Sequence, residues 1–64
     1  LPVFEEALGD KDPVVRVFGL QGLATLGPKA APLVEKVRRA AQDKDKGVRE
    51  ASAKALAAIE KGGR

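Results

Sequence analysis

The side chains that carry most enzyme chemistry are nearly absent from this chain of 64 residues. It contains no His, Cys, Tyr, Trp or Asn, and its aliphatic hydroxyl groups are limited to Ser52 and Thr25. A Ser–His–Asp or Cys–His device cannot be assembled from this set, because no base is present to activate a nucleophile. The sequence therefore predicts no catalytic residue and no cofactor.

Two acidic segments have the residue types of a calcium-binding loop but lack its spacing. They are Asp10-Lys11-Asp12 and Asp43-Lys44-Asp45. An EF-hand loop that began at either segment would need Gly at its sixth position and an acidic residue at its twelfth. Those positions hold Val15 and Gln21 in one case and Val48 and Lys54 in the other. We expect no metal site, and helix capping is the simpler role for these aspartates.

The same two segments mark an internal repeat of 33 residues. The stretch from Asp10 to Arg16 returns as Asp43 to Arg49, and Leu23-Ala24 returns as Leu56-Ala57. A period of this size is typical of stacked helical repeats. Aliphatic residues and alanine dominate and only two residues are aromatic, a composition that favours close-packed helices. We predict an all-α fold.

The spacing of apolar and small residues predicts one helix over 13–26 and another that starts after Asp45. On the first helix the buried face comprises Val15, Gly19, Gly22, Leu23 and Leu26, and on the second Val48, Ser52, Ala55, Leu56 and Ile59. Asp12 and Asp45 are expected to cap these helices, with Pro13 in the first helical position. Gly27 should end the first helix as a left-handed cap, before Pro28.

Two further helices, over 2–8 and about 29–42, are expected to supply the packing partners. Gly19 and Gly22 each cost their helix about 1 kcal/mol relative to alanine. We therefore expect a neighbouring helix to approach closely at these glycines. The end of the chain, residues 61–64, should fray because paired glycines have no helical preference.

Asp-x-Asp-x-x-Val-Arg before each long helix, together with Leu-Gly-Pro at 26–28, resembles the HEAT-like repeats, including their short bacterial version and the repeats of phycobilin lyases. The resemblance covers nearly the whole chain. It implies an α-solenoid fragment of about two helix-turn-helix repeats, with four short antiparallel helices. The single module 1–64 would comprise repeat one at about 1–31, repeat two at about 32–61 and a tail at 62–64.

In that family the matching Asp and Arg residues join neighbouring repeats through hydrogen bonds. The resemblance thus implies an inter-repeat role for Asp10, Arg16, Asp43 and Arg49. A planar guanidinium can reach a loop carboxylate and free carbonyls together, which would fix the rotation between repeats. The alternative makes Arg16 and Arg49 contacts for an anion.

Our leading functional interpretation is a non-enzymatic protein-interaction or scaffolding module whose second helices line a concave face. On that face we place Arg16, Val17, Leu20, Gln21, Arg49, Glu50, Ala53 and Lys54. The partner would be a protein or peptide of unknown identity. The helix over 13–26 is apolar nearly all round, so it either buries both faces or exposes Val17, Leu20 and Ala24 as a patch.

An alternative function is sequence-independent binding to a nucleic-acid backbone, as in some HEAT-like proteins. The net charge is +3, and residues 33–64 carry nine basic against five acidic side chains. The contacts would be Lys36, Arg38, Arg39, Lys46, Arg49 and Lys54. Interspersed acidic residues favour an ordinary solvated surface instead. No apolar run approaches the roughly 20 residues that span a bilayer, so we expect no membrane partner.

The chain starts at Leu1 with neither Met nor a charged leader, so we expect it to be part of a larger protein. Any enzyme activity would then belong to the attached chain. Two repeats are fewer than the three or more that a solenoid core usually needs. The isolated module should therefore be marginally stable or self-associate, with its first helix and the helix over 13–26 contacting the same surfaces of a second copy. Nothing in the sequence indicates a cellular compartment.

Overall fold

The computed structural model describes residues 2–61, which form four α-helices and one 3₁₀ segment. The elements are α1 (Pro2–Leu8), α2 (Pro13–Leu26), η1 (the 3₁₀ segment Gly27–Leu33), α3 (Val34–Ala40) and α4 (Lys46–Lys61). The described part of the chain contains no strand, which confirms the all-α prediction. None of its helices is long and apolar enough to cross a bilayer.

Both long helices begin at an aspartate, as predicted. The Asp12 carboxylate accepts a hydrogen bond from the Val14 N–H at 2.9 Å, and Pro13 occupies the first helical position. The Asp45 carboxylate accepts from the Val48 N–H at 3.0 Å. Each bond satisfies one of the backbone donors that the first turn of a helix leaves free. The sequence thus sets the start of α2 and of α4 locally.

The third predicted helix is only partly α-helical. Residues 27–33 form the 3₁₀ segment, and the α-helix starts at Val34. Pro28 and Pro32 cause this difference, because neither has an N–H for an α-helical bond and the Pro32 ring would clash with the carbonyl four residues earlier. Gly27 has a φ of 61°, as a glycine cap requires, but its ψ of −131° lies outside the left-handed helical region that we predicted.

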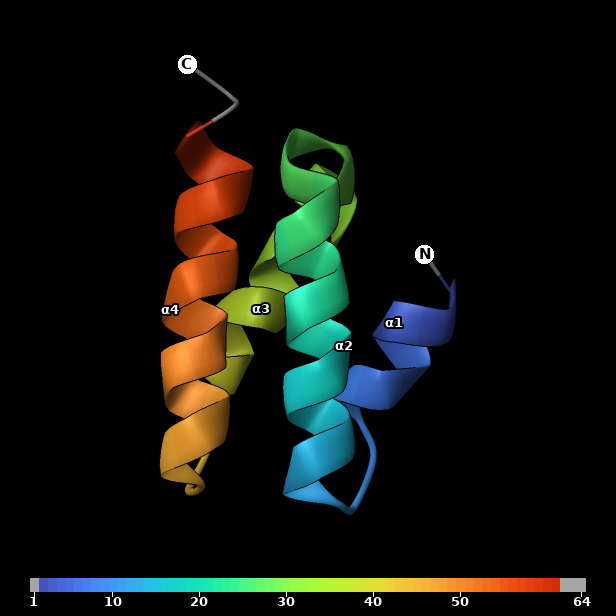
Figure 1. The fold of residues 1–64 in the computed structure, drawn as a ribbon, viewed down its shortest axis with the longest axis vertical. Coiled ribbons are helices and arrows are strands. Elements are labelled where there is room, and N and C mark those ends of the chain that lie inside the picture. Colours follow the sequence, from blue (N-terminus) through green and yellow to red (C-terminus); the bar gives the residue numbers. More distant parts are fainter. Residues whose placement is uncertain (1, 62–64) are drawn as a thin grey trace.

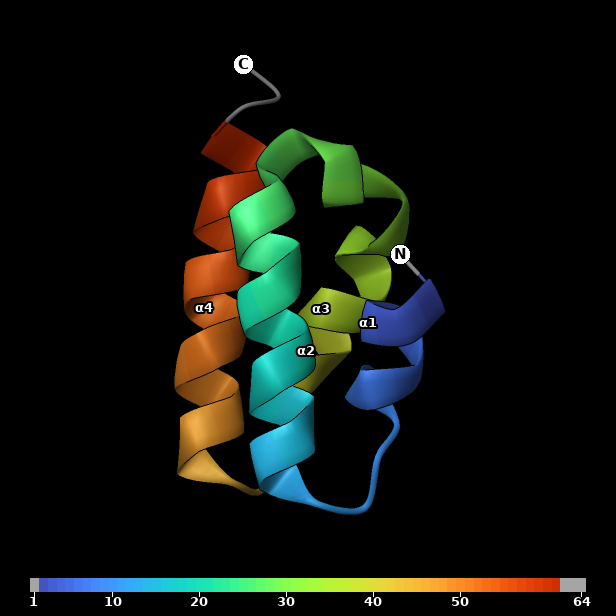
Figure 2. The same cartoon turned by 45° about the vertical axis from the view of Figure 1, so that its right-hand side comes forward.

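The elements pack in two helix pairs joined by η1. In Figures 1 and 2, successive helices run in opposing directions, whereas α2 and α4 lie side by side and point the same way. Helix α2 lies between α1 and α4, and α4 packs against α2, η1 and α3. The buried apolar residues are Leu20, Leu23, Ala30, Leu33, Val37, Val48, Ala55 and Ile59. One continuous core therefore joins the two pairs.

Close approach of α1 explains the two glycines of α2. A Cβ atom on Gly19 would lie 2.8 Å from the Cβ of Ala7 and 3.0 Å from the carbonyl oxygen of Phe4. A Cβ atom on Gly22 would lie 2.2 Å from the Phe4 ring. Side chains at these positions would force the helices apart, so the contact with α1 offsets the helix propensity that glycine costs.

Two predictions about α4 are wrong. Leu56, which we placed on the buried face, packs against the core but is only half-buried, whereas its repeat equivalent Leu23 is fully buried. Val15, Gly22 and Leu26 of the face predicted for α2 are half-buried as well. Leu23 belongs to a helix with neighbours on two sides, whereas among residues 2–61 no helix packs beyond α4. Lys61, which we expected to fray, is the last residue of α4. The rest of the predicted tail, 62–64, lies outside the described residues.

This difference in burial predicts unequal costs for the two leucines. Leu23→Ala should lower the free energy of unfolding by about 2–5 kcal/mol, because it leaves a cavity in the core. Leu56→Ala should cost clearly less, since part of that side chain is already in water. Urea unfolding of both variants measures the difference. Equal losses would show that the leucines have equivalent surroundings, in conflict with the packing described above.

Candidate interaction surface and the contacts that position it

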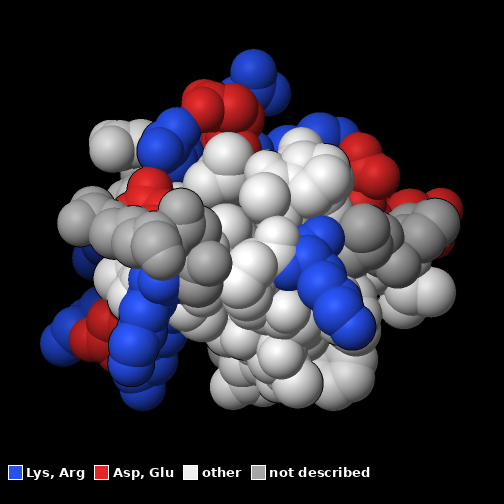
Figure 3. Space-filling model, turned by 90° about the horizontal axis from the view of Figure 1, so that it is seen from above, with Lys and Arg blue, Asp and Glu red and all other residues white. Residues whose placement is uncertain are grey.

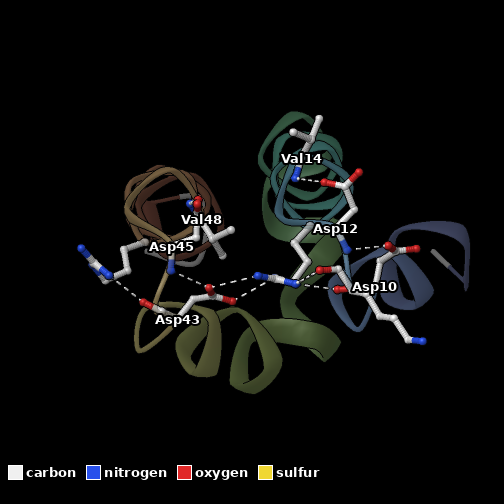
Figure 4. A network of polar contacts seen from close by, with 9 residues as sticks. Asp10, Asp12, Val14, Asp43, Asp45 and Val48 are labelled. Carbon is white, nitrogen blue, oxygen red and sulfur yellow. Dashed lines mark hydrogen bonds and ion pairs between the residues drawn. The ribbon is translucent and has the colours of Figure 1, made fainter.

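The Arg16 side chain joins the first helix pair to the second. Its Nη1 donates to the carbonyl oxygens of Asp10 at 2.6 Å and Lys11 at 3.0 Å. Its Nη2 donates to Asp43 Oδ1 at 3.2 Å, and its Nε forms an ion pair with Asp43 Oδ2 at 2.9 Å without hydrogen-bond geometry. Figure 4 shows this network, with Asp10 at one side and Asp43 at the other. One planar side chain thus joins its own loop to that of Asp43, which lies 27 residues further along the chain than Arg16.

The two aspartates also shape their own loops in the same way. Asp10 Oδ1 accepts from the Asp12 N–H, and Asp43 Oδ1 accepts from the Asp45 N–H, both at 2.8 Å. The hydrogen bond from the Asp45 N–H is the largest cause that holds the pKa of the Asp43 carboxyl below its usual value, and the hydrogen bond and the charge of Arg16 lower it further. The ionised form of Asp43 is therefore part of the native contact.

Arg49 repeats only half of the pattern. Its Nη1 donates to the carbonyl oxygen of Asp43 at 2.8 Å, as Arg16 does to that of Asp10. No carboxylate within residues 2–61 forms an ion pair with Arg49. Of the four residues to which the resemblance gave an inter-repeat role, Arg16 and Asp43 therefore meet across the two pairs, whereas Asp10 and Arg49 make contacts within their own loops.

Four of the eight residues predicted for the binding face line one groove between α2 and α4. They are Val17, Gln21, Glu50 and Lys54. Ala24, Gly47 and Ala51 provide the small apolar part of the lining. Val17 Cγ2 would lie 3.8 Å from a Cβ atom on Gly47, so the two helices are in contact at this end of the groove. We call this surface the α2–α4 groove.

The other four predicted residues lie elsewhere. Leu20 is fully buried in the core shared by the two helix pairs, so its assignment to an exposed face is wrong. Arg16 is engaged in the network between the helix pairs. Arg49 and Ala53 are exposed but do not line the groove. The α2–α4 groove therefore contains only part of the binding face that was predicted from the sequence.

The basic residues of the nucleic-acid alternative do not form a surface of uniform charge. Lys36 pairs with Glu5, and Arg38 pairs with both Glu35 and Glu60. These carboxylates raise the pKa of Arg38, with the hydrogen bond that Arg38 donates to Glu60 as the largest cause. Figure 3 shows acidic and basic side chains mixed around an uncharged centre at the end of the molecule where η1 lies. Two of the six basic residues, Lys36 and Arg38, are thus balanced by carboxylates.

The groups with catalytic potential have structural roles. Ser52 is fully buried, and its hydroxyl donates to the Arg49 carbonyl oxygen at 2.8 Å within the same helix. Within residues 2–61 no three acidic side chains come together in a way that could hold a metal ion.

Sequence reasoning missed an exposed apolar surface on the first helix pair. Among residues 2–61 the large apolar residues that stand exposed are Val3, Val14 and Phe18, and Phe18 borders an apolar groove between α1 and α2. A signal was present in the repeat itself, because Phe18 corresponds to Ala51 and Val14 to Gly47. A bulky residue in one repeat and a small one in the other indicate different neighbours.

Comparison with protein families supports the repeat interpretation. The family model for HEAT repeats matches residues 1–63. Comparisons with the curated proteins and with the solved structures gave no match.

The ion pair of Asp43 predicts how stability depends on pH. A carboxyl whose folded-state pKa is lowered contributes stability above its unfolded pKa of about 4, and that contribution is lost as the pH falls through the folded value. Asp43→Asn keeps the acceptor for the loop but removes the charge. This variant should have a lower free energy of unfolding than the wild type at pH 7. When the pH is lowered below about 5, its free energy of unfolding should fall less than that of the wild type. Urea unfolding at each pH measures both differences.

Asp10→Asn is the matched control, because the Asp10 carboxylate occupies the same loop position and has no arginine partner among the described residues. It should lower stability at pH 7 less than Asp43→Asn does. If acidification destabilises Asp43→Asn as much as the wild type, Asp43 is not the group that titrates.

Proposed function

Because the chain belongs to the HEAT repeat family, we propose that it is a non-enzymatic protein-interaction module and that the α2–α4 groove takes a segment of a partner protein. HEAT repeats are in general scaffolds for protein–protein interaction. The observation that carries the proposal is the groove itself, in which small apolar residues of two neighbouring repeats lie between polar rims. Such a surface excludes water from a partner side chain while its rim fixes the orientation.

The lining residues indicate the chemistry of the bound segment. Ala24, Gly47 and Ala51 leave room for a small aliphatic side chain. Glu50 and Lys54 are exposed and one helical turn apart, so they can contact a basic and an acidic group of the partner in a fixed order. We therefore expect a short segment with an aliphatic residue between groups of opposite charge.

Binding to nucleic acid has less support. The basic residues are divided between α3 and α4, and two of the six proposed contacts are already paired with carboxylates. The absence of Trp and Tyr also limits stacking on bases. Attachment to a catalytic chain is compatible with the proposal, since the groove would then serve to hold a substrate protein or a subunit.

Selection of phage-displayed random peptides on the immobilised chain tests the proposal. Selected peptides should bind the wild type and lose affinity at least about tenfold, or about 1.4 kcal/mol, with Lys54→Glu, because one rim charge is reversed. Titration by fluorescence anisotropy measures the loss. Lys29→Glu is the matched control, since it makes the same charge change on η1, and it should leave the affinity unchanged. Peptides that bind both variants equally, or a selection that yields none, would contradict the proposal.

A further inference from the structure

The exposed apolar residues of α2 correspond to small residues that line the α2–α4 groove in the second repeat. Val14 and Phe18 are 73% and 63% exposed. Their equivalents, 33 residues later, are Gly47 and Ala51, and both line the contact of α4 with α2. The side of α2 that faces away from α4 thus corresponds to the side of α4 that receives α2.

An apolar groove extends this uncovered side. It is lined by Phe4, Phe18, Gln21, Gly22, Thr25 and Leu26. The α4 equivalents of Gly22 and Leu26 are Ala55 and Ile59, which are 0% and 4% exposed because α2 and η1 pack against that helix. The groove is therefore the first repeat's version of a surface that the fold buries in the second. We call the groove together with Val14 the α1–α2 side.

The polar network has two unpaired ends of opposite charge. The Arg49 guanidinium is held by the Asp43 carbonyl just as Arg16 is held by that of Asp10, but it has no carboxylate partner within residues 2–61. The Asp10 carboxylate accepts a loop N–H at 2.8 Å, as Asp43 does, but no arginine of the described chain reaches it. Arg49 and Asp10 are thus in the same local geometry as the pair that joins the repeats.

We propose that the exposed side of α4 in one copy of this chain docks on the α1–α2 side of a second copy, by the same step that relates the two repeats within the chain. Arg49 of one copy then pairs with Asp10 of the next, as Arg16 pairs with Asp43. The contact continues the interface between α2 and α4 and joins charges of opposite sign. The occupant of the apolar groove is a second copy of the chain.

Side-chain sizes can be compared between the contact of α2 with α4 within the chain and the proposed contact between two copies. Within the chain, Val17 of α2 packs against Gly47 of α4, so the bulky residue comes from the preceding helix. On α4 the equivalents of Leu20 and Ala24 are Ala53 and Ala57, which are small and exposed. Within the chain Ala24 and Ala51 line one groove, so across copies their equivalents Ala57 and Phe18 would meet, and the bulky residue comes from the following helix. The equivalents of Val17 and Gly47 are Glu50 and Val14, so the side chain of Glu50 would lie against Val14. The small Ala57 thus leaves room for Phe18, which close packing requires.

The proposed contact uses different surfaces on the two copies, and it therefore does not close at a dimer. Each docked copy still presents an exposed α4, to which the next copy can bind. This geometry differs from the pairing of identical surfaces that the sequence suggested. Growth from the α4 side leads to open-ended oligomers.

Sedimentation equilibrium across about a hundredfold range of concentration tests this geometry. The weight-average mass of the chain of 6.7 kDa should rise with concentration and pass the dimer value without a plateau. A constant monomer mass, or a plateau at the dimer, would overturn the proposal.

Charge exchange tests the pairing of Arg49 with Asp10. In Asp10→Arg every contact would place two arginines together, and in Arg49→Asp two aspartates, so each variant alone should remain monomeric. An equimolar mixture should associate again, because each contact then has one arginine and one aspartate. A mixture that stays monomeric while the wild type associates would refute the pairing. Far-UV circular dichroism establishes that both variants are folded.

Two further variants cover the case in which a charge change disturbs a loop. Phe18→Glu alters an exposed side chain and should abolish association with the fold intact. Arg39→Glu, on the exposed surface of α3, should leave association unchanged. Association of Phe18→Glu at the wild-type level would overturn the proposal. Peptide binding that depends on Lys54 does not require this contact, so the two proposals fail independently.

Discussion

The position of the second helix pair against the first depends on where the Arg16 guanidinium lies. That group binds two carbonyl oxygens of its own repeat and the Asp43 carboxylate of the next. Its planar shape allows it to satisfy both at once, which a lysine could not do. The side chains of Arg16 and Asp43 are 17% and 16% exposed, so solvent screens the pair less than an ion pair on the open surface. The rotation between the repeats, and with it the shape of the α2–α4 groove, follows from this contact.

Apolar packing sets the distances between neighbouring helices, which the polar network of Arg16 does not determine. Gly19 and Gly22 lower helix propensity, and they stand where α1 leaves no room for a side chain on α2. At Gly47 a Cβ atom would lie 3.8 Å from Val17 Cγ2, so α4 meets α2 there at an ordinary contact distance. The fold thus uses small residues to bring helices together and one arginine to set their orientation. The α2–α4 groove is a consequence of both.

Patterns within a few residues predicted much of this structure. Features that depend on which helices lie side by side could not be predicted in this way. Asp12-Pro13 and Asp45 act through hydrogen bonds within a few residues, so the start of each long helix could be inferred. The burial of Leu20 and the partial exposure of Leu56 depend on which helix lies beside them, and periodicity within one helix does not contain that information. The 3₁₀ segment was signalled by Pro28 and Pro32, four residues apart, but a helical periodicity alone does not separate the two helix types. Half of the predicted binding face lies together in the groove because positions one repeat apart face each other across α2 and α4.

A double-mutant cycle between Arg16 and Asp43 tests the central claim most directly. Unfolding free energies of Arg16→Gln, Asp43→Asn and the double variant give the coupling between the two side chains. If this contact joins the helix pairs, the double variant should lose clearly less stability than the sum of the two single losses, because either single change already breaks the contact. Strict additivity of the two losses would contradict the account, since it would mean that the two residues act independently.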